Sequence, residues 1–539
     1  MLHVAFLRSR RVGPLLTCLS AALVADGALP RVAHAQPSAP LTYLYLRGST
    51  DTLGVEVITR SPTAVGGVLT MRGQPRLEWE HTIVDGRPTT LQLKVFAPGA
   101  AESATPVQTG AFTVQGDSVS VNVAAGAQTI NQRAATRAGA QPLVNASVLH
   151  AAFMASYALR MKQDSVPLFL TSGAQTVVGA VHLRGDTVLL QMAGSQMHIV
   201  NAPDGLPRVV TMGAQPIRVV RARGPVAAPP SRPERIDYSA PASAPYSAES
   251  VSISTPRGYA LAGTLTKPKG MAKVPVVITI SGSGPQERDS RLPTVPGYAI
   301  FREIADTLGR RGIAVLRYDD RGVGESGGAT SRAKATSADF ADDVRTIVAW
   351  LRTRPDIDGS RIALVGHSEG GMIAPMVAAT DSTLRGIALL AGTAFSGRRI
   401  LMFQNRLGVD AAPGLTTAQR DSIYATVPGK LDSIGAADAW YGYFMAHDPL
   451  ITARTVKPPV LILQGLTDTQ VTSDQADTLA LALKAGGSRA VMVRTFPATN
   501  HLFLEDPTGL AQGYAQLKNV RVRRDVLGAL AEWMVRTLR

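Results

Sequence analysis

The segment Gly366-His367-Ser368-Glu369-Gly370 holds a serine between two glycines, directly after the apolar residues 362–365. Glycine is favoured where another backbone must approach closely or where φ is positive. A serine in such a turn, between a strand and a helix, presents its hydroxyl at the edge of a sheet as a nucleophile. The segment therefore predicts that Ser368 is a catalytic serine.

A serine hydroxyl is a weak nucleophile at neutral pH, so it needs a base, and the base needs an orienting acid. Asp468 follows the apolar residues 460–463, and His501 follows the apolar residues 491–493. If both runs are parallel strands, their loops reach the same sheet edge as Ser368. We predict a triad of Ser368, Asp468 and His501. Asp474 is the second choice for the acid, because its position better fits the first turn of a helix.

Acyl transfer also needs N–H donors for the oxyanion of the tetrahedral intermediate. One expected donor is the backbone N–H of Glu369, the residue after the nucleophile. The other is expected in residues 280–285 (ISGSGP), where we assign the Ser283 N–H because Gly282 and Gly284 allow close approach. A phosphate-binding loop is the alternative, but this segment lacks the lysine and the spacing of a P-loop.

Residues 319–326 (DDRGVGES) place two aspartates after another apolar run. A metal site could use paired carboxylates, but no histidine or carboxylate cluster at ligand spacing accompanies them, and Arg321 disfavours a cation. We interpret the segment as a structural turn whose charges hold the loops beside the active site. We expect no metal and no cofactor, because the triad is accompanied by neither a metal cluster nor a dinucleotide fingerprint.

Residues 248–539 alternate short apolar runs with helical segments. The runs are apolar on both faces, as expected of strands that helices cover on both sides; they are residues 274–280, 314–318, 362–365, 386–390, 460–463 and 491–493. Alternating patterns near 251–253 and 261–265 predict an opening antiparallel pair. We predict an α/β fold with a doubly wound, mainly parallel sheet.

Residues 41–225 differ, because apolar and polar residues alternate between Gly, Asp-Gly and Ser/Thr turns. This pattern predicts an antiparallel, β-rich N-terminal domain of unknown role. Within it, residues 147–161 have helical spacing and predict a helix, with His150 as a packed histidine rather than a ligand. Residues 226–247 are rich in Pro, Ala and Ser, which predicts a linker before the second domain, 248–539.

The first 35 residues begin with a basic head, continue with an apolar middle and end in Ala33-His34-Ala35. This order predicts a cleavable signal peptide, 1–35, and a periplasmic or secreted protein. The single cysteine, Cys18, lies inside it, so the mature chain would have no thiol. No other segment is long and apolar enough to cross a bilayer.

The formal net charge of +15 comes from scattered Lys and Arg, and aromatic residues make up only 5% of the chain. Nucleic-acid binding would need a concentrated basic patch. We expect a small-molecule ester or peptide substrate and no nucleic-acid partner, and the oligomeric state does not follow from the sequence.

These motifs resemble the α/β-hydrolase superfamily, most of all bacterial exported serine hydrolases of the serine aminopeptidase and prolyl-oligopeptidase-related group, many of which are called esterases. The resemblance covers about residues 248–539. It rests on ISGSGPQERD (280–289), YDDRGVGES (318–326), GHSEGG (366–371), LQGLTDTQV (463–471) and NHLF (500–503).

The resemblance implies that Ser368, Asp468 and His501 form the triad. It also implies a cap between the strand after the serine turn and the strand before the acid, where residues 395–455 fit. Cap residues usually shape the acyl pocket, which makes Tyr441, Phe444 and Met445 candidates for the substrate pocket.

The favoured function is hydrolysis of carboxylic esters through an acyl-enzyme. The alternative is an aminopeptidase or small-peptide hydrolase with the same triad. Such an exopeptidase needs buried acids for the substrate ammonium, and Glu287, Asp289 and Glu369 are candidates. Glu287 and Asp289 flank Arg288, which favours internal ion pairs instead. A third class, a binding module with a vestigial hydrolase, is disfavoured by the complete triad.

Overall fold

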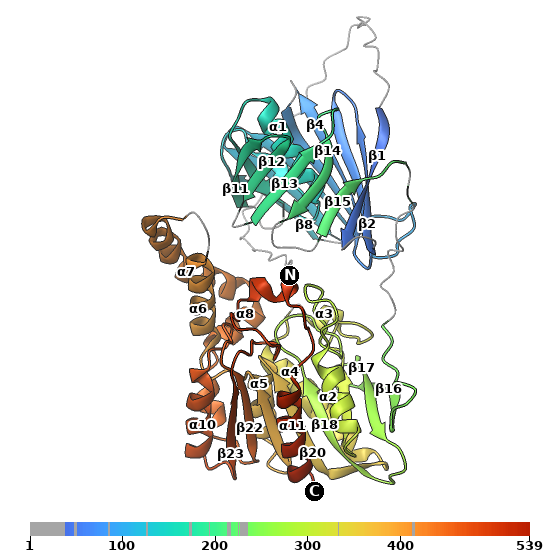
Figure 1. The fold of residues 1–539 in the computed structure, drawn as a ribbon, viewed down its shortest axis with the longest axis vertical. Coiled ribbons are helices and arrows are strands. Elements are labelled where there is room, and N and C mark those ends of the chain that lie inside the picture. The colour runs from blue at the N-terminus through green and yellow to red at the C-terminus, as the bar shows by residue number, and fades with distance from the viewer. Residues whose placement is uncertain are drawn as a thin grey trace, which may run out of the picture. The chain divides into compact units, whose positions relative to one another are not determined.

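The computed structural model describes residues 38–539, except 48–50, 85–86, 126–127, 172–174, 193–194, 213–216, 225, 227–235, 333 and 412–414. The chain divides into two compact units, Met1–Ile236 and Asp237–Arg539 (Figure 1). The division falls within residues 226–247, the range predicted as a linker. The predicted signal peptide, 1–35, lies outside the described residues.

Unit 2, Asp237–Arg539, is built on an eight-stranded sheet with the order β16-β17-β19-β18-β20-β21-β22-β23. The first three strands in this order pair antiparallel, and the remaining pairs are parallel. The strands are β16 (Tyr246–Ser254), β17 (Ala260–Pro268), β18 (Val274–Ile280), β19 (Ala314–Tyr318), β20 (Ile357–His367), β21 (Gly386–Leu390), β22 (Val460–Gly465) and β23 (Val491–Phe496). The predicted mainly parallel sheet with an opening antiparallel pair is confirmed.

Helices cover both faces of this sheet. Val276 and Ile278 of β18 lie in one hydrophobic core, and Val277 between them lies in the other. The helices of unit 2 outside the cap are α2 (Ile300–Gly309), α3 (Ala329–Arg332), α4 (Ser337–Thr353), α5 (Gly370–Ala378), α10 (Asp474–Ala485), the 3-10 helix η1 (Ala511–Gln516) and α11 (Arg524–Thr537). Residues from α4, α5 and α10 fill the first core, whereas α2 and α11 fill the second. Burial on both faces explains why these strands are apolar throughout.

A helical cap interrupts the sheet between β21 and β22. Its helices are α6 (Gly397–Asp410), α7 (Thr417–Ala437), α8 (Ala439–Ala446) and α9 (Pro449–Ala453). They occupy the range 395–455 that the sequence predicted for a cap.

The described part of unit 1 is a 15-stranded sheet with one helix. In this sheet, β2 to β8 lie in chain order on one side of β1, and β15 to β9 lie in reverse chain order on its other side. Neighbouring strands are antiparallel, except for the parallel pair β9 and β10. The strands are β1 (Ser38–Arg47), β2 (Asp51–Arg60), β3 (Ala64–Met71), β4 (Arg76–Val84), β5 (Arg87–Phe96), β6 (Gln108–Gln115), β7 (Ser118–Ala125), β8 (Gln128–Ala135), β9 (Gln141–Leu143), β10 (Ser165–Leu170), β11 (Gln175–Arg184), β12 (Thr187–Met192), β13 (Ser195–Asn201), β14 (Pro207–Met212) and β15 (Ile217–Arg221).

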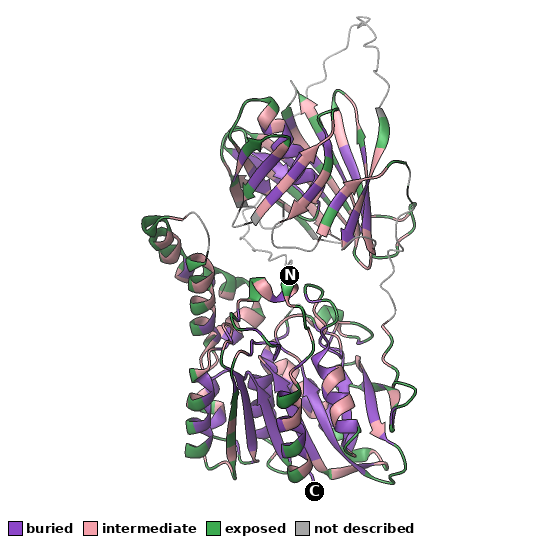
Figure 2. Cartoon of the chain, in the orientation of Figure 1, coloured by how far each residue is buried: buried purple, intermediate pink, exposed green. Residues whose placement is uncertain are grey.

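One hydrophobic core joins both sides of this sheet to the helix α1 (Val148–Arg160). It includes Phe112 from β6, Ile199 from β13 and Phe153 from α1. Because strands from both sides share one core, the sheet curves around it, and Figure 2 shows the buried residues gathered there. The predicted antiparallel β-rich domain and its helix at 147–161 are confirmed.

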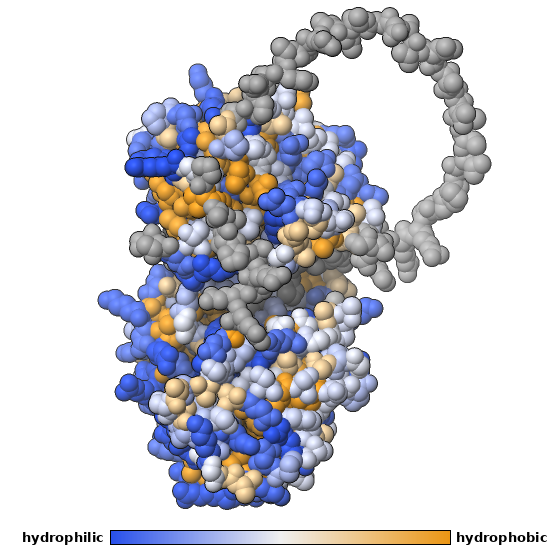
Figure 3. Space-filling model, turned by 90° about the vertical axis from the view of Figure 1, so that its right-hand side faces the viewer, coloured by the Kyte–Doolittle hydropathy of each residue, from blue (hydrophilic) through white to orange (hydrophobic). Residues whose placement is uncertain are grey.

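The surface of each unit is mixed in character. Figure 3 shows, on the face in view, hydrophilic side chains over much of each unit and hydrophobic side chains in separate patches. No helix among the described residues is long and apolar enough to span a bilayer.

A fully buried carboxylate, Glu56, lies in the core of unit 1. It accepts hydrogen bonds from the Tyr45 hydroxyl, from Trp79 Nε1 at 2.9 Å and from Ser147 Oγ at 2.8 Å. These donors replace the water that a carboxylate loses on burial. Burial nevertheless raises the pKa of Glu56 above its usual value.

Beside this carboxylate, His81 and His150 are joined through their Nε2 atoms at 2.6 Å. The backbone N–H of Val144 donates to His150 Nδ1 at 3.1 Å, so the proton of His150 is on Nε2 and points at His81. His81 then carries its proton on Nδ1 and donates it to the Thr90 carbonyl at 2.8 Å. His150 is thus a packed histidine, as the sequence predicted, and both imidazoles are neutral.

We predict that unit 1 loses stability as the pH falls from about 6.5 towards 4. Burial lowers the pKa of His81 to about 4 and that of His150 well below its usual value. Between the folded and unfolded pKa values, the unfolded chain binds protons that the folded unit excludes, so acid favours unfolding. The raised pKa of Glu56 has the opposite effect, because the folded unit binds this proton more readily than the unfolded chain does. We expect the two histidines together to outweigh this single carboxyl group.

Hydrogen exchange of α1 and β4, followed by mass spectrometry between pH 7 and pH 5, measures this loss. His81→Gln should flatten the pH dependence, whereas His182→Gln, a change at an exposed histidine of β11, should leave it intact. Equal pH dependence in His81→Gln and the unchanged protein would contradict the prediction.

Candidate active site

Ser368 occupies the turn between β20 and α5 with a φ of 56°, in the left-handed region that side chains disfavour. A Cβ on Gly366 would lie 2.0 Å from the Gly370 carbonyl oxygen, and one on Gly370 would lie 2.2 Å from the Ile280 carbonyl oxygen. No side chain fits at either position. The two glycines are therefore required for the backbone contacts that hold the serine turn.

His501 and Asp468 meet at the same end of the sheet. His501 Nδ1 lies 2.8 Å from Asp468 Oδ2, and both residues are buried. The loops that carry them follow β23 and β22, which are parallel neighbours. Because a carboxylate can only accept, Nδ1 carries the proton and Nε2 is left as the basic nitrogen.

Asp468 is itself fixed by its own loop. Its Oδ1 accepts hydrogen bonds from the backbone N–H groups of Gln470 at 2.8 Å and Val471 at 2.9 Å. Asp474, the second choice for the acid, is instead the first residue of α10. The structure therefore brings His501 together with Asp468, and Asp474 lies in a helix N-terminus, as its sequence position suggested.

His367, the residue before the serine, connects the serine turn to the histidine loop. Its Nε2 lies 2.9 Å from the carbonyl oxygen of His501, and the two rings lie 4.9 Å apart. Burial lowers the pKa of His367 to about 3, so the neutral ring donates this hydrogen bond. The contact places Ser368 beside the His501 loop. The hydrogen bond from Ser368 Oγ to His501 Nε2 stays a prediction.

The glycine-rich loop after β18 lies against the serine. A Cβ on Gly282 would be 3.2 Å from the Cβ of Ser368. Ser283 follows Gly282 in this loop, and Glu369 follows Ser368 at the start of α5. Both predicted oxyanion donors are therefore in segments that adjoin the nucleophile, and their role stays a prediction.

The side chain of Glu369 makes a network that the sequence did not reveal. Its Oε1 accepts hydrogen bonds from Ser337 Oγ at 2.7 Å and from Trp440 Nε1 at 2.8 Å. Burial raises the pKa of Glu369. The residue after Ser368 is thus joined to α4 and to the cap helix α8.

The paired aspartates after β19 hold loops together. Asp319 binds Arg288 through Nη2 at 2.7 Å and Nε at 3.0 Å. Asp320 accepts from Ser281 Oγ at 2.6 Å and from the Gln286 N–H at 3.0 Å, and burial raises its pKa to about 7. These partners support the structural interpretation of the turn. No group of three potential metal ligands occurs among the described residues.

The three pocket candidates lie in the cap helix α8 or at its end. Phe444 is buried, with its ring stacked on Trp440 at 5.0 Å and pressed against Gly397 of α6. Its ring therefore packs within the cap. Tyr441 makes an edge contact with Trp440, and Met445 touches Gly435 of α7. A substrate pocket at Tyr441, Phe444 and Met445 stays a prediction.

The strand order, the serine turn between β20 and α5, and the cap before β22 define unit 2 as an α/β-hydrolase. A family model described as serine aminopeptidase, S33, matches residues 297–508, which include the serine turn and the loops of Asp468 and His501. Unit 2 thus has the α/β-hydrolase fold, and its residues 297–508 are similar to this family.

Curated relatives include both esterases and peptidases. The chain is 27% identical over 283 residues to the esterase EstD of Thermotoga maritima, covering 51% of this chain and 66% of EstD. It is 26% identical over 258 residues to dipeptidyl aminopeptidase BIII of Pseudoxanthomonas mexicana, covering 45% of this chain and 31% of that protein. The chain thus spans two thirds or less of the length of these relatives.

Among solved structures, an esterase of Pyrococcus furiosus matches 55% of this chain and 94% of its own chain, with 16% identity and a TM-score of 0.36. A dienelactone hydrolase of Anabaena variabilis matches 55% of this chain and 100% of its own, with 20% identity and a TM-score of 0.35.

We predict that Glu369→Ala lowers the free energy of unfolding of unit 2 by about 2 to 5 kcal/mol, because two buried donors, on Ser337 and Trp440, lose their acceptor. Glu369→Gln keeps an acceptor oxygen, and we expect a loss of less than about 1.5 kcal/mol. Urea denaturation of the full chain measures both values. Equal losses in the two variants would show that the carboxyl oxygen is not the acceptor that matters.

Proposed function

We propose that this protein is an exported serine hydrolase that cleaves carboxylic esters through Ser368, His501 and Asp468. The hydrogen bond between His501 Nδ1 and Asp468 Oδ2 is the observation that carries the proposal, because it orients an imidazole at the sheet edge where Ser368 is displayed. A fixed tautomer with a free Nε2 is what a general base for a serine requires.

In the proposed mechanism, His501 Nε2 takes the proton of Ser368 while the serine oxygen attacks the ester carbonyl. Asp468 stabilises the imidazolium that forms. The backbone N–H groups of Glu369 and Ser283 bind the oxyanion, and the protonated His501 then gives its proton to the leaving alcohol. Water activated by His501 hydrolyses the acyl-enzyme in the second half of the cycle.

An aminopeptidase with the same triad is the second candidate, and the match to dipeptidyl aminopeptidase BIII favours keeping it. Binding of a substrate ammonium needs a carboxylate that is free to accept it. Asp289 already has ion pairs with arginines, Glu287 accepts from the Tyr238 hydroxyl at 3.0 Å, and Glu369 accepts from Trp440. These partners support ester hydrolysis over aminopeptidase activity.

Export is proposed from the sequence of residues 1–35. If the signal is cleaved after Ala35, the secreted or periplasmic chain begins at Gln36, and mass spectrometry of the exported protein would detect that N-terminus.

We predict that Ser368→Ala reduces kcat/KM for a chromogenic ester by a factor of about 10⁴ or more, because residual catalysis comes from binding and the oxyanion donors alone. Ser247→Ala, at an exposed position of β16, is the matched control and should keep full activity. Undiminished hydrolysis by Ser368→Ala would reject Ser368 as the nucleophile.

We also predict that short chromogenic esters are turned over faster than aminoacyl anilides. The physical reason is that the three candidate acids, Glu287, Asp289 and Glu369, already have internal partners, which leaves them less able to bind a substrate ammonium. Parallel kcat/KM measurements on the two substrate panels test the ranking. Faster anilide turnover would make the aminopeptidase the better description.

A further inference from the structure

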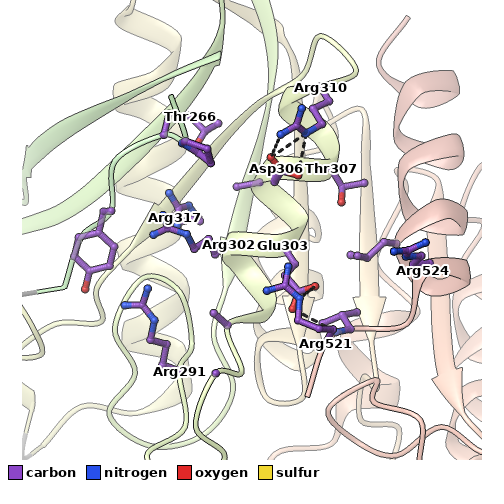
Figure 4. A pocket seen from close by; sticks show the side chains of 18 of the residues that line it. Thr266, Arg291, Arg302, Glu303, Asp306, Thr307, Arg310, Arg317, Arg521 and Arg524 are labelled. Atoms are coloured by element: carbon purple, nitrogen blue, oxygen red, sulfur yellow. Dashed lines mark hydrogen bonds and ion pairs between the residues drawn. The ribbon is translucent and has the colours of Figure 1, made fainter. Parts of the chain in front are cut away.

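Unit 2 contains a cavity whose lining residues take no part in the proposed mechanism. A cavity of about 1190 Å³ lies between the segment that enters this unit at 238–241, helix α2 and the segment 519–525 before α11 (Figure 4). Arginines line it from several parts of the chain: Arg291, Arg302, Arg310, Arg317, Arg521, Arg523 and Arg524.

Three of these arginines share one carboxylate. Arg317 and Arg291 form ion pairs with the buried Asp289, the latter at 2.9 Å, and Arg302 lies 3.7 Å from the same group. Figure 4 shows Arg291, Arg302 and Arg317 on the same side of the cavity. Three guanidinium groups around a single carboxylate leave an excess of positive charge at this wall.

The remaining acids of the cavity do not offset this excess, because they have partners of their own. Asp306 pairs with Arg310 at 2.9 Å, Glu303 lies 3.4 Å from Arg521, and Asp525 pairs with Arg523 at 2.7 Å; Glu505 also lines the cavity, near Arg523. Glu287 also lies near Arg317 and accepts from the Arg291 N–H, so Arg291, Arg302 and Arg317 set against Asp289 and Glu287 leave one net positive charge at this wall.

Arg317 is the most unusual member of this group. Only 3% of its side chain is exposed, and its Nε has no hydrogen-bond partner among the described residues. Burial and the nearby Arg302 both lower its pKa, against the effect of Asp289. A buried guanidinium with an unused donor is costly unless an acceptor reaches it.

Two further features of the wall suit an anion. Helix α2 begins beside the cavity; its N-cap, Ala299, provides no side-chain acceptor, and of its first N–H groups that of Phe301 donates to the Asp289 carbonyl oxygen at 3.3 Å. The positive end of this helix therefore adds to the field of the arginines. Arg302 also donates to the carbonyl oxygens of Asp237 at 2.5 Å and Ser239 at 3.1 Å, which fixes its guanidinium at the wall.

We propose that the wall formed by Arg291, Arg302 and Arg317 binds a phosphate- or sulfate-type oxyanion, carried by a molecule that the larger cavity accommodates. Planar guanidinium groups bind such oxyanions through paired N–H donors. The Tyr238 ring, which lies 5.8 Å from the Arg291 guanidinium, and Pro241 supply less polar surface beside the charged wall for the rest of the ligand.

Calorimetric titration of the full chain with inorganic phosphate, at constant ionic strength set with chloride, tests this site. We expect saturable binding that weakens about tenfold in Arg291→Gln, because one charge-assisted contact is lost. Arg291→Glu should abolish binding. Arg291 suits the test because its side chain is 32% exposed and pairs only with Asp289 among the ion pairs of the structure's described residues.

Arg398→Glu is the matched control, since it makes the same charge change at a half-exposed arginine of α6, outside the cavity. It should bind phosphate as the unchanged protein does, and circular dichroism melts should show that both glutamate variants fold. No phosphate binding by the unchanged protein, or equal binding by Arg291→Glu, would overturn the proposal.

The source of the oxyanion is settled by a second arm with vesicles of phosphatidylcholine, with and without phosphatidic acid. Binding to the acidic vesicles that is lost in Arg291→Glu would assign the site to a lipid headgroup. Phosphate binding without vesicle binding would assign it to a soluble ligand. Either result supports the site. Full ester hydrolysis by both Arg291→Gln and Arg291→Glu would show that the anion site is separate from the proposed catalytic site.

Discussion

The candidate active site depends on one steric constraint, the close contact of three backbone segments at the serine turn. The turn packs so tightly against the end of β18 and the start of α5 that neither Gly366 nor Gly370 has room for a Cβ. Ser368 can hold its positive φ only because these contacts fix the chain around it. The displayed hydroxyl is therefore a consequence of backbone packing, and the cost of the strained residue is offset by the buried sheet below it.

Buried polar contacts then set the loops around that turn. Asp468 accepts from its own loop while it orients His501, and Asp320 joins the glycine-rich loop to the end of β19. Glu369 joins the serine turn to the cap, because it accepts a hydrogen bond from Trp440 of α8. Buried polar groups of this kind are stable only when every donor has an acceptor, so each contact restricts where its loop can lie. The candidate catalytic loops and the cap are in this way joined by buried polar contacts.

Much of this arrangement could be predicted from the sequence, because its signals are local. The sequence predicted strands at 274–280 and 314–318, and the structure has β18 at Val274–Ile280 and β19 at Ala314–Tyr318. The candidate triad residues could be proposed because parallel strands deliver their following loops to one edge of the sheet, and the structure shows the contact between His501 and Asp468. The Glu369–Trp440 hydrogen bond could not be predicted, since 71 residues separate its partners and no sequence pattern links Trp440 to the serine motif.

The sequence by itself indicated the two-unit organisation, the classes of both sheets and the candidates for nucleophile, base and acid, with Asp468 and Asp474 as first and second choices for the acid. Periodicity and turn residues encode those features over a few neighbouring positions. The tertiary structure alone decided which carboxylate meets His501, which histidines of unit 1 are hydrogen-bonded to each other, and that three arginines gather around Asp289. Those outcomes depend on distances between segments far apart in the chain, and such distances are fixed only when the sheets and their helices pack.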